Sequence, residues 1–97
     1  MKVLLICAAG MSTSILMKKM TQYAQDQAEP LEIRAVGLME YLDFVDQYDV
    51  LLLGPQVAYR LDTVKASTAK PAACIPAMDY ALGDCPHIFG LIHQLIA

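Results

Sequence analysis

The chain has 97 residues, of which 57% are hydrophobic and 18% are charged. That apolar content is enough for one small folded domain and excludes a disordered tail. Seven lysines and arginines stand against ten aspartates and glutamates, a net charge of -3. This balance argues against a nucleic-acid binder and against a protein held on a membrane by basic residues.

The first half of the chain alternates predicted strands and helices. Residues 3–6 are wholly apolar, which predicts a central parallel strand covered on both faces. Small and hydroxyl side chains in 7–14 predict a loop that leads into a helix over 15–27. A second strand is expected over 32–36, and a short amphipathic helix over 39–47. The apolar positions of the first helix are Ile15, Leu16, Met20, Tyr23 and Ala24.

The second half repeats the alternation. Residues 50–53 are again fully apolar and predict the third strand, followed by a short helix over 57–67. A weaker fourth strand is expected over 72–75, then a loop over 76–87. From residue 88 to the end a single apolar stripe predicts the last helix. That stripe consists of Ile88, Leu91, Ile92, Leu95 and Ile96.

This β-α-β-α-β-α-β-α order predicts an α/β fold: an open four-stranded parallel sheet with helices on both faces. No repeat or linker interrupts it, so residues 1–97 are expected to form a single domain. In such sheets, ligands bind at the loops beyond the carboxyl ends of the strands. Those loops are 7–14, 37–39, 54–57 and 76–87.

The first ten residues imitate an export signal, because a lysine precedes an apolar run and small residues. The run over 3–9 is at the lower limit for such a signal, and Lys18 and Lys19 follow in the predicted helix. We therefore expect this segment to belong to the folded domain. No stretch approaches the ~20 apolar residues of a membrane span, so no membrane insertion is expected.

The cysteines and histidines do not form a metal-binding pattern. The three cysteines are an odd number without a CxxC pair, and the two histidines lie far from the first of them in sequence. We expect a reducing cytoplasmic location, with no metal and no cofactor. Cys74 and Cys85 are interpreted as structural or incidental, and His87 and His93 are given no role.

Cys7 is the candidate catalytic residue. It closes the first strand, and the small side chains after it leave backbone N–H groups able to point inward. The N-terminus of the next helix adds unpaired donors and a positive dipole end. Such surroundings favour a thiolate and can cradle a tetrahedral oxyanion. The plainer alternatives are a buried, inert cysteine and hydroxyls at 12–14 that only cap the helix.

A second loop follows the third strand. The Gln56 amide and the Tyr59 hydroxyl are expected to form a wall that faces the cysteine loop, although an ordinary strand-to-helix turn would also explain Pro55. Asp79 follows the fourth strand. We interpret it as a helix cap or a turn residue in preference to a general acid.

Two motifs, CAAGMSTS at 7–14 and YDVLLLGPQVAYRL at 48–61, together resemble one family. It is the IIB component, of lactose/cellobiose/chitobiose type, of the bacterial phosphoenolpyruvate-dependent sugar phosphotransferase system. The resemblance covers essentially the whole chain in length and element order, and it is looser in the C-terminal third.

The resemblance implies a cytoplasmic phosphoryl carrier with a phosphatase-like phosphate loop. A phosphohistidine on a IIA partner would donate to Cys7, and the phosphocysteine would donate to a cellobiose-, lactose- or chitobiose-type sugar held by the membrane IIC partner. Gln56 and Tyr59 match the family's neighbouring loop. The residues carried over as the phosphate-binding loop are Ala8, Ala9, Gly10, Met11, Ser12, Thr13 and Ser14.

The main alternative is a low-molecular-weight cysteine phosphatase or an arsenate reductase of similar fold. Those phosphatases need a Cys-x5-Arg motif whose arginine clamps the phosphate. Here the sixth position after Cys7 is Thr13, which argues against a phosphatase. A receiver module would need acidic residues at the end of the first strand, where Cys7 stands instead.

Overall fold

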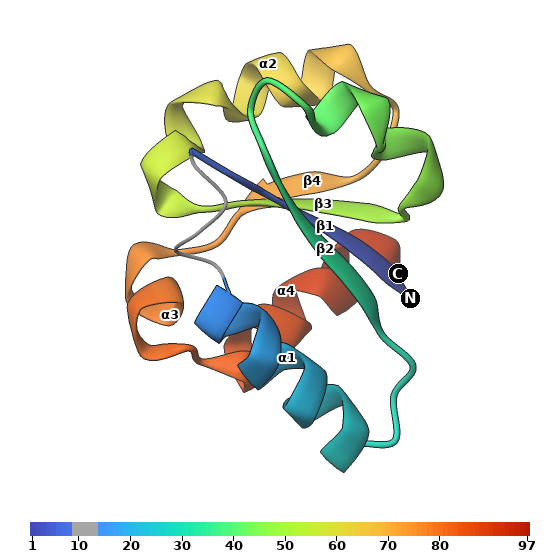
Figure 1. The fold of residues 1–97 in the computed structure, drawn as a ribbon, viewed down its shortest axis with the longest axis vertical. Coiled ribbons are helices and arrows are strands. Elements are labelled where there is room, and N and C mark those ends of the chain that lie inside the picture. The colour runs from blue at the N-terminus through green and yellow to red at the C-terminus, as the bar shows by residue number, and fades with distance from the viewer. Residues whose placement is uncertain (9–13) are drawn as a thin grey trace.

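The computed structural model describes residues 1–8 and 14–97. Across these residues, parallel strands form a single sheet between two helical layers (Figure 1). The predicted fold class is therefore confirmed. The strands are β1 (Lys2–Cys7), β2 (Glu32–Gly37), β3 (Val50–Leu53) and β4 (Ala72–Cys74).

The strand order in the sheet is β2-β1-β3-β4, so β1 and β3 are central and β2 and β4 are edges. The central strands are wholly apolar apart from Lys2 because both of their faces are covered. The connection after β1 leads to the edge strand β2, and the connection after β3 leads to the opposite edge strand, β4. The carboxyl end of β1 is therefore a topological switch point, where open α/β sheets bind their ligands.

The lower layer of Figure 1 contains α1 (Ser14–Asp26), α3 (Ala77–Leu82) and α4 (Cys85–Ile96). α1 and α4 cover the sheet face that carries Leu5 and Leu52. The buried residues that these two helices contribute to this core are Leu16, Met20, Ala24, Cys85, Ile88, Phe89 and Ile92.

The upper layer contains α2 (Leu61–Ser67) and three 3-10 segments, η1 (Tyr41–Asp43), η2 (Val45–Gln47) and η3 (Pro55–Arg60). It covers the face that carries Leu4, Ile6, Leu51 and Leu53. The buried residues that this layer contributes are Tyr41, Val45, Val57 and Val64.

The prediction of an amphipathic helix over 39–47 is wrong. Two 3-10 turns occupy this segment instead, and neither receives a side-chain cap. Leu42 is exposed, whereas Tyr41 is buried. A connection this short gains its stability from burying Tyr41 and Val45, and two tight turns bury both without a continuous helix.

The helix predicted over 57–67 is likewise divided. η3 precedes α2, and the backbone departs from helical geometry at Val57, whose side chain is buried in the upper core. Within α1 the buried residues are Leu16, Met20 and Ala24, while Ile15 is exposed, so the apolar stripe begins one residue later than predicted.

The loop predicted over 76–87 contains a short helix and the start of α4. α3 ends at Gly83, which adopts the left-handed conformation typical of a helix C-terminus. α4 begins directly after Asp84, whose side chain accepts the His87 N–H. Cys85, predicted in a turn, is a buried residue of α4. Among the helices in the described part of the chain, none is long and apolar enough to cross a membrane.

Candidate functional site

Cys7 ends β1 at the switch point, beside Gly37 of the neighbouring strand. Its side chain is 1% exposed, and its Sγ donates a hydrogen bond to the Val36 carbonyl oxygen at 3.5 Å. Only a protonated sulfur can donate this bond. A thiol that donates this bond must lose its proton before the sulfur can act as a nucleophile.

The predicted phosphate-binding loop falls largely outside the described residues. Ala8 is exposed next to Cys7, and Ser14 is the first residue of α1. These two residues place the ends of the loop at the carboxyl edge of the sheet and at a helix N-terminus. The members outside the described residues are Ala9, Gly10, Met11, Ser12 and Thr13, and their role stays a prediction.

The loop after β3 lies against the end of β1. The Gly54 N–H donates to the Ile6 carbonyl oxygen at 2.9 Å. The Gln56 side chain folds back over Gly54, because its Oε1 lies 3.0 Å from the point that a Cβ on Gly54 would occupy. The Tyr80 ring lies 3.6 Å from the same point. Gln56 and Tyr80 therefore both lie beside Gly54, next to the end of β1.

Two tyrosines belong to this region, and only one of them had a predicted role. Tyr80, to which the sequence analysis assigned no role, lies in α3, after the fourth strand. Because the carboxyl ends of parallel strands lie at one edge of the sheet, its place after a strand is the signal that could have found it. Tyr59 is 76% exposed on η3. Its predicted part in the site stays a prediction.

Two hollows flank the switch point. One, of about 230 Å³, lies between the ends of β1 and β2 and includes Ala8, Val36, Gly37 and Glu40. The other, of about 220 Å³, lies between α1 and α3 and is lined by Ile15, Leu16, Lys19, Tyr80, Ala81 and Gly83. The first adjoins the end of β1, since Ala8 follows Cys7 and Val36 accepts the Cys7 hydrogen bond.

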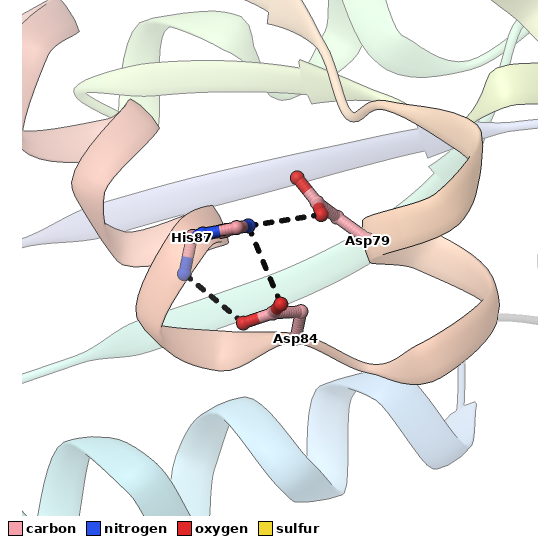
Figure 2. Close-up of polar contacts among 3 residues, drawn as sticks. All are labelled: Asp79, Asp84 and His87. Atoms are coloured by element: carbon pink, nitrogen blue, oxygen red, sulfur yellow. Dashed lines mark hydrogen bonds and ion pairs between the residues drawn. The ribbon is translucent and has the colours of Figure 1, made fainter.

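A polar cluster joins α3 to α4 (Figure 2). His87 Nδ1 lies 3.2 Å from Asp79 Oδ1 and 3.3 Å from Asp84 Oδ2. The hydrogen bond to Asp79 and the nearby charge of Asp84 raise the pKa of His87 above its ordinary value. The prediction that Asp79 is a cap or turn residue is wrong: it lies inside α3, and the capping residue is Asp84, at the start of α4.

The other two thiols are poor nucleophiles. Burial raises the pKa of Cys74 and that of Cys85, and for Cys85 this effect exceeds the opposing charge of Lys19. Both sulfurs are therefore protonated at neutral pH, in agreement with the structural role predicted for them.

A family model described as "PTS system, Lactose/Cellobiose specific IIB subunit" matches residues 2–86. The chain belongs to this family. It is thus a IIB component of lactose/cellobiose type, a phosphotransferase subunit of a sugar transport system, and the resemblance found in the sequence is confirmed.

Characterised relatives agree with this assignment. The chain is 41% identical over 86 residues to the cellobiose-specific EIIB component of Lactococcus lactis subsp. lactis (strain IL1403), with 80% of each chain covered. It is 45% identical over 58 residues to the oligo-beta-mannoside-specific EIIB component of Bacillus subtilis (strain 168). That second match covers 60% of this chain and 56% of the relative, so it spans little more than half of that protein's length.

Solved structures share the fold. The lactose-specific IIB domain of Streptococcus pneumoniae superposes with a TM-score of 0.87 at 19% identity and covers 100% of this chain and 98% of its own. The cellobiose-specific IIB protein of Borrelia burgdorferi gives a TM-score of 0.82 at 29% identity and covers 99% and 91%. Some relatives are larger: 70% of this chain matches 12% of the lactose-specific EIICB component of Streptococcus mutans serotype c (strain ATCC 700610 / UA159).

Proposed function

We propose that the chain is a phosphoryl carrier whose Cys7 takes a phosphoryl group from a phosphohistidine of a IIA partner. Cys7 then passes it to a sugar of cellobiose, lactose or chitobiose type bound by a membrane IIC partner. The observation that supports this most is the place of Cys7, at the carboxyl end of a central strand and at the switch point of the sheet.

The first transfer exchanges one bond to phosphorus for another. The Cys7 sulfur, having released its proton, attacks the phosphorus in line, the P–N bond of the donor breaks, and the P–S bond forms. The imidazole leaves neutral once it takes up a proton. Because the resting thiol is buried and donates to Val36, this step requires the sulfur to break that hydrogen bond and reach the surface.

The second transfer reverses the roles of nucleophile and leaving group. A sugar hydroxyl oxygen attacks the same phosphorus, the P–S bond breaks, and the hydroxyl proton is released as the thiolate leaves. Backbone N–H groups of 8–14 would stabilise the equatorial oxygens in both steps. That segment contains no histidine or carboxylate able to activate water, which would preserve the intermediate from hydrolysis.

The remaining assignments follow from this role. Gln56 would contribute its amide to the phosphoryl site, since it lies beside the end of β1, and Tyr59 would contact a docked partner. We infer that residues 1–97 act as a single IIB domain in the cytoplasm, with partners that are proteins and no nucleic acid. Relatives whose names join IIC and IIB in a single component support direct contact with the membrane partner.

Phosphoryl transfer from a phosphorylated IIA protein tests the proposal. The wild-type chain should become labelled on Cys7, as mapped by mass spectrometry, and iodine should cleave the label rapidly because it is a thiophosphate ester. Cys7→Ser should fold normally and take up no stable label. Cys74→Ser is the matched control, since it removes a partly buried thiol of high pKa and should label like the wild type.

Three results would contradict the carrier role. Labelling that persists in Cys7→Ser, or a label that resists iodine, would move the phosphoryl group to another residue such as His87 or His93. Steady turnover of an aryl phosphate without any partner would instead favour the phosphatase alternative.

A further inference from the structure

The cluster formed by Asp79, Asp84 and His87 has the donor atoms and the spacing of a metal site. Donor atoms bound to one tetrahedral Zn²⁺ at about 2.0–2.1 Å lie roughly 3.3 Å from one another. His87 Nδ1 lies 3.2 Å from Asp79 Oδ1 and 3.3 Å from Asp84 Oδ2. One donor atom from each of the three residues falls within 4.8 Å of the others.

The backbone holds these side chains in place. The Asp84 N–H donates to the Asp79 carbonyl oxygen at 2.9 Å, and the Ile88 N–H donates to the Asp84 carbonyl oxygen at 3.0 Å. Gly83 turns the chain between α3 and α4 in the left-handed conformation. Because the turn already positions the ligands, binding a cation would order little additional chain.

The carboxylates are also partly withdrawn from water. The Asp79 side chain is 17% exposed and that of Asp84 is 31% exposed, whereas the His87 side chain is 71% exposed. Two negative charges thus converge on an imidazole that leaves one side of the cluster open to solvent. An entering ion has both an electrostatic reason to bind and a path by which to enter.

We propose that Asp79, Asp84 and His87 bind a divalent transition-metal ion of the Zn²⁺ class. Nδ1 of neutral His87 and one oxygen of each carboxylate would be ligands, and water would take the open position. The imidazole selects Zn²⁺ over the oxygen-preferring Mg²⁺ and Ca²⁺. Asp84 can bind through Oδ2 and still cap α4, because Oδ1 accepts the His87 N–H.

Two features of positive charge oppose the binding of a cation and limit its affinity. Asp84 caps the N-terminus of α4, so the positive end of this helix dipole lies beside the cluster. The Lys19 side chain lies over Gly83, with its Nζ 3.0 Å from the point that a Cβ on Gly83 would occupy. The site should therefore bind more weakly than a closed structural zinc site with four protein ligands.

The test is a titration of the chelator-treated full chain with Zn²⁺. We expect one bound ion per chain by calorimetry, a rise in melting temperature, and a zinc-induced shift of the His87 Nδ1 resonance in ¹⁵N NMR. Replacing a ligand, in His87→Gln or Asp79→Asn, should weaken binding by at least about tenfold. Mg²⁺ at the same concentration should cause none of these changes.

His93→Gln is the matched control. It removes the other histidine, which contacts only one carboxylate among the described residues, Glu29 at 2.7 Å, and it should bind Zn²⁺ like the wild type. Zinc affinity unchanged in His87→Gln would overturn the proposal and place the ion elsewhere, for example on a thiol. An unshifted His87 Nδ1 resonance in the wild-type protein would overturn it without the use of any variant.

Discussion

Two glycines show at the scale of single residues how position decides the effect of a substitution. Gly83 has a φ of 62°, and a Cβ added there would lie 2.7 Å from Lys19 Cδ. Gly90 lies inside α4 and is exposed, and apart from its chain neighbours and the backbone of its own helix no described atom lies within 4 Å of the point that its Cβ would occupy. The same change to alanine should therefore have opposite effects at the two positions.

We expect Gly83→Ala to lower the free energy of unfolding by about 1–2 kcal/mol, because a Cβ is unfavourable in the left-handed region. Gly90→Ala should raise it by about 0.5–1 kcal/mol, because alanine is the better helix former. Urea unfolding of both variants and the wild type measures the difference. Equal effects in the two variants would show that neither backbone position matters in the way described.

At the same scale, the sequence located the candidate nucleophile but not its surroundings. Cys7 follows a wholly apolar strand, and this local signal placed it correctly at the carboxyl edge of the sheet. The hydrogen bond to Val36 comes from a neighbouring strand, and the contacts of Gln56 and Tyr80 around Gly54 come from two separate connections. Contacts of this kind depend on strand order, which local residue patterns do not specify.

At the scale of elements, α3 is the helix least anchored by packing. Within α3, all of which the structure describes, no residue is buried, and Met78 and Leu82 are exposed. α4, in contrast, buries Ile88, Phe89 and Ile92 in the lower core. Tyr80 packs partly buried against the lower core, and what otherwise secures α3 is its hydrogen-bonded turn and the polar cluster with His87.

We therefore expect α3 to open locally in metal-free protein. Its amides should show hydrogen-exchange protection at least about tenfold lower than those of α4, because few buried contacts oppose its opening. NMR-detected exchange of Tyr80 and Ile88 compares the two helices directly, since both amides donate helical hydrogen bonds. Equal protection at these positions would mean that α3 opens only when the whole domain unfolds.

The elements that sequence patterns missed are short ones. The bounds of β1, α1 and β3 were predicted nearly to the residue, because a wholly apolar run and a long helical periodicity are both strong signals. Residues 39–47 and 76–84 were not, since a segment of one or two turns follows the tertiary contacts available to it. The signals for α4 were present: Asp84 as cap and Pro86 in the first turn.

At the scale of the whole molecule, both helical layers depend on the same central strands. Successive residues of β3 point to opposite faces, so Leu52 belongs to the lower core and Leu51 to the upper core. Both side chains are fully buried. Damage to either core should therefore be transmitted through the sheet to the other layer, which predicts a single cooperative unfolding transition.

Leu51→Ala and Leu52→Ala test this coupling as a matched pair. Each should lower the free energy of unfolding by about 2–5 kcal/mol, because each leaves a cavity in a packed core. In urea, the NMR signals of Tyr41 and Tyr48 report on the upper core, and those of Tyr23, whose ring lies 4.8 Å from that of Phe89, report on the lower. The midpoints from both sets should coincide in each variant and shift together relative to the wild type. Separate midpoints, with only the layer that lost its leucine melting early, would show that the two layers unfold independently.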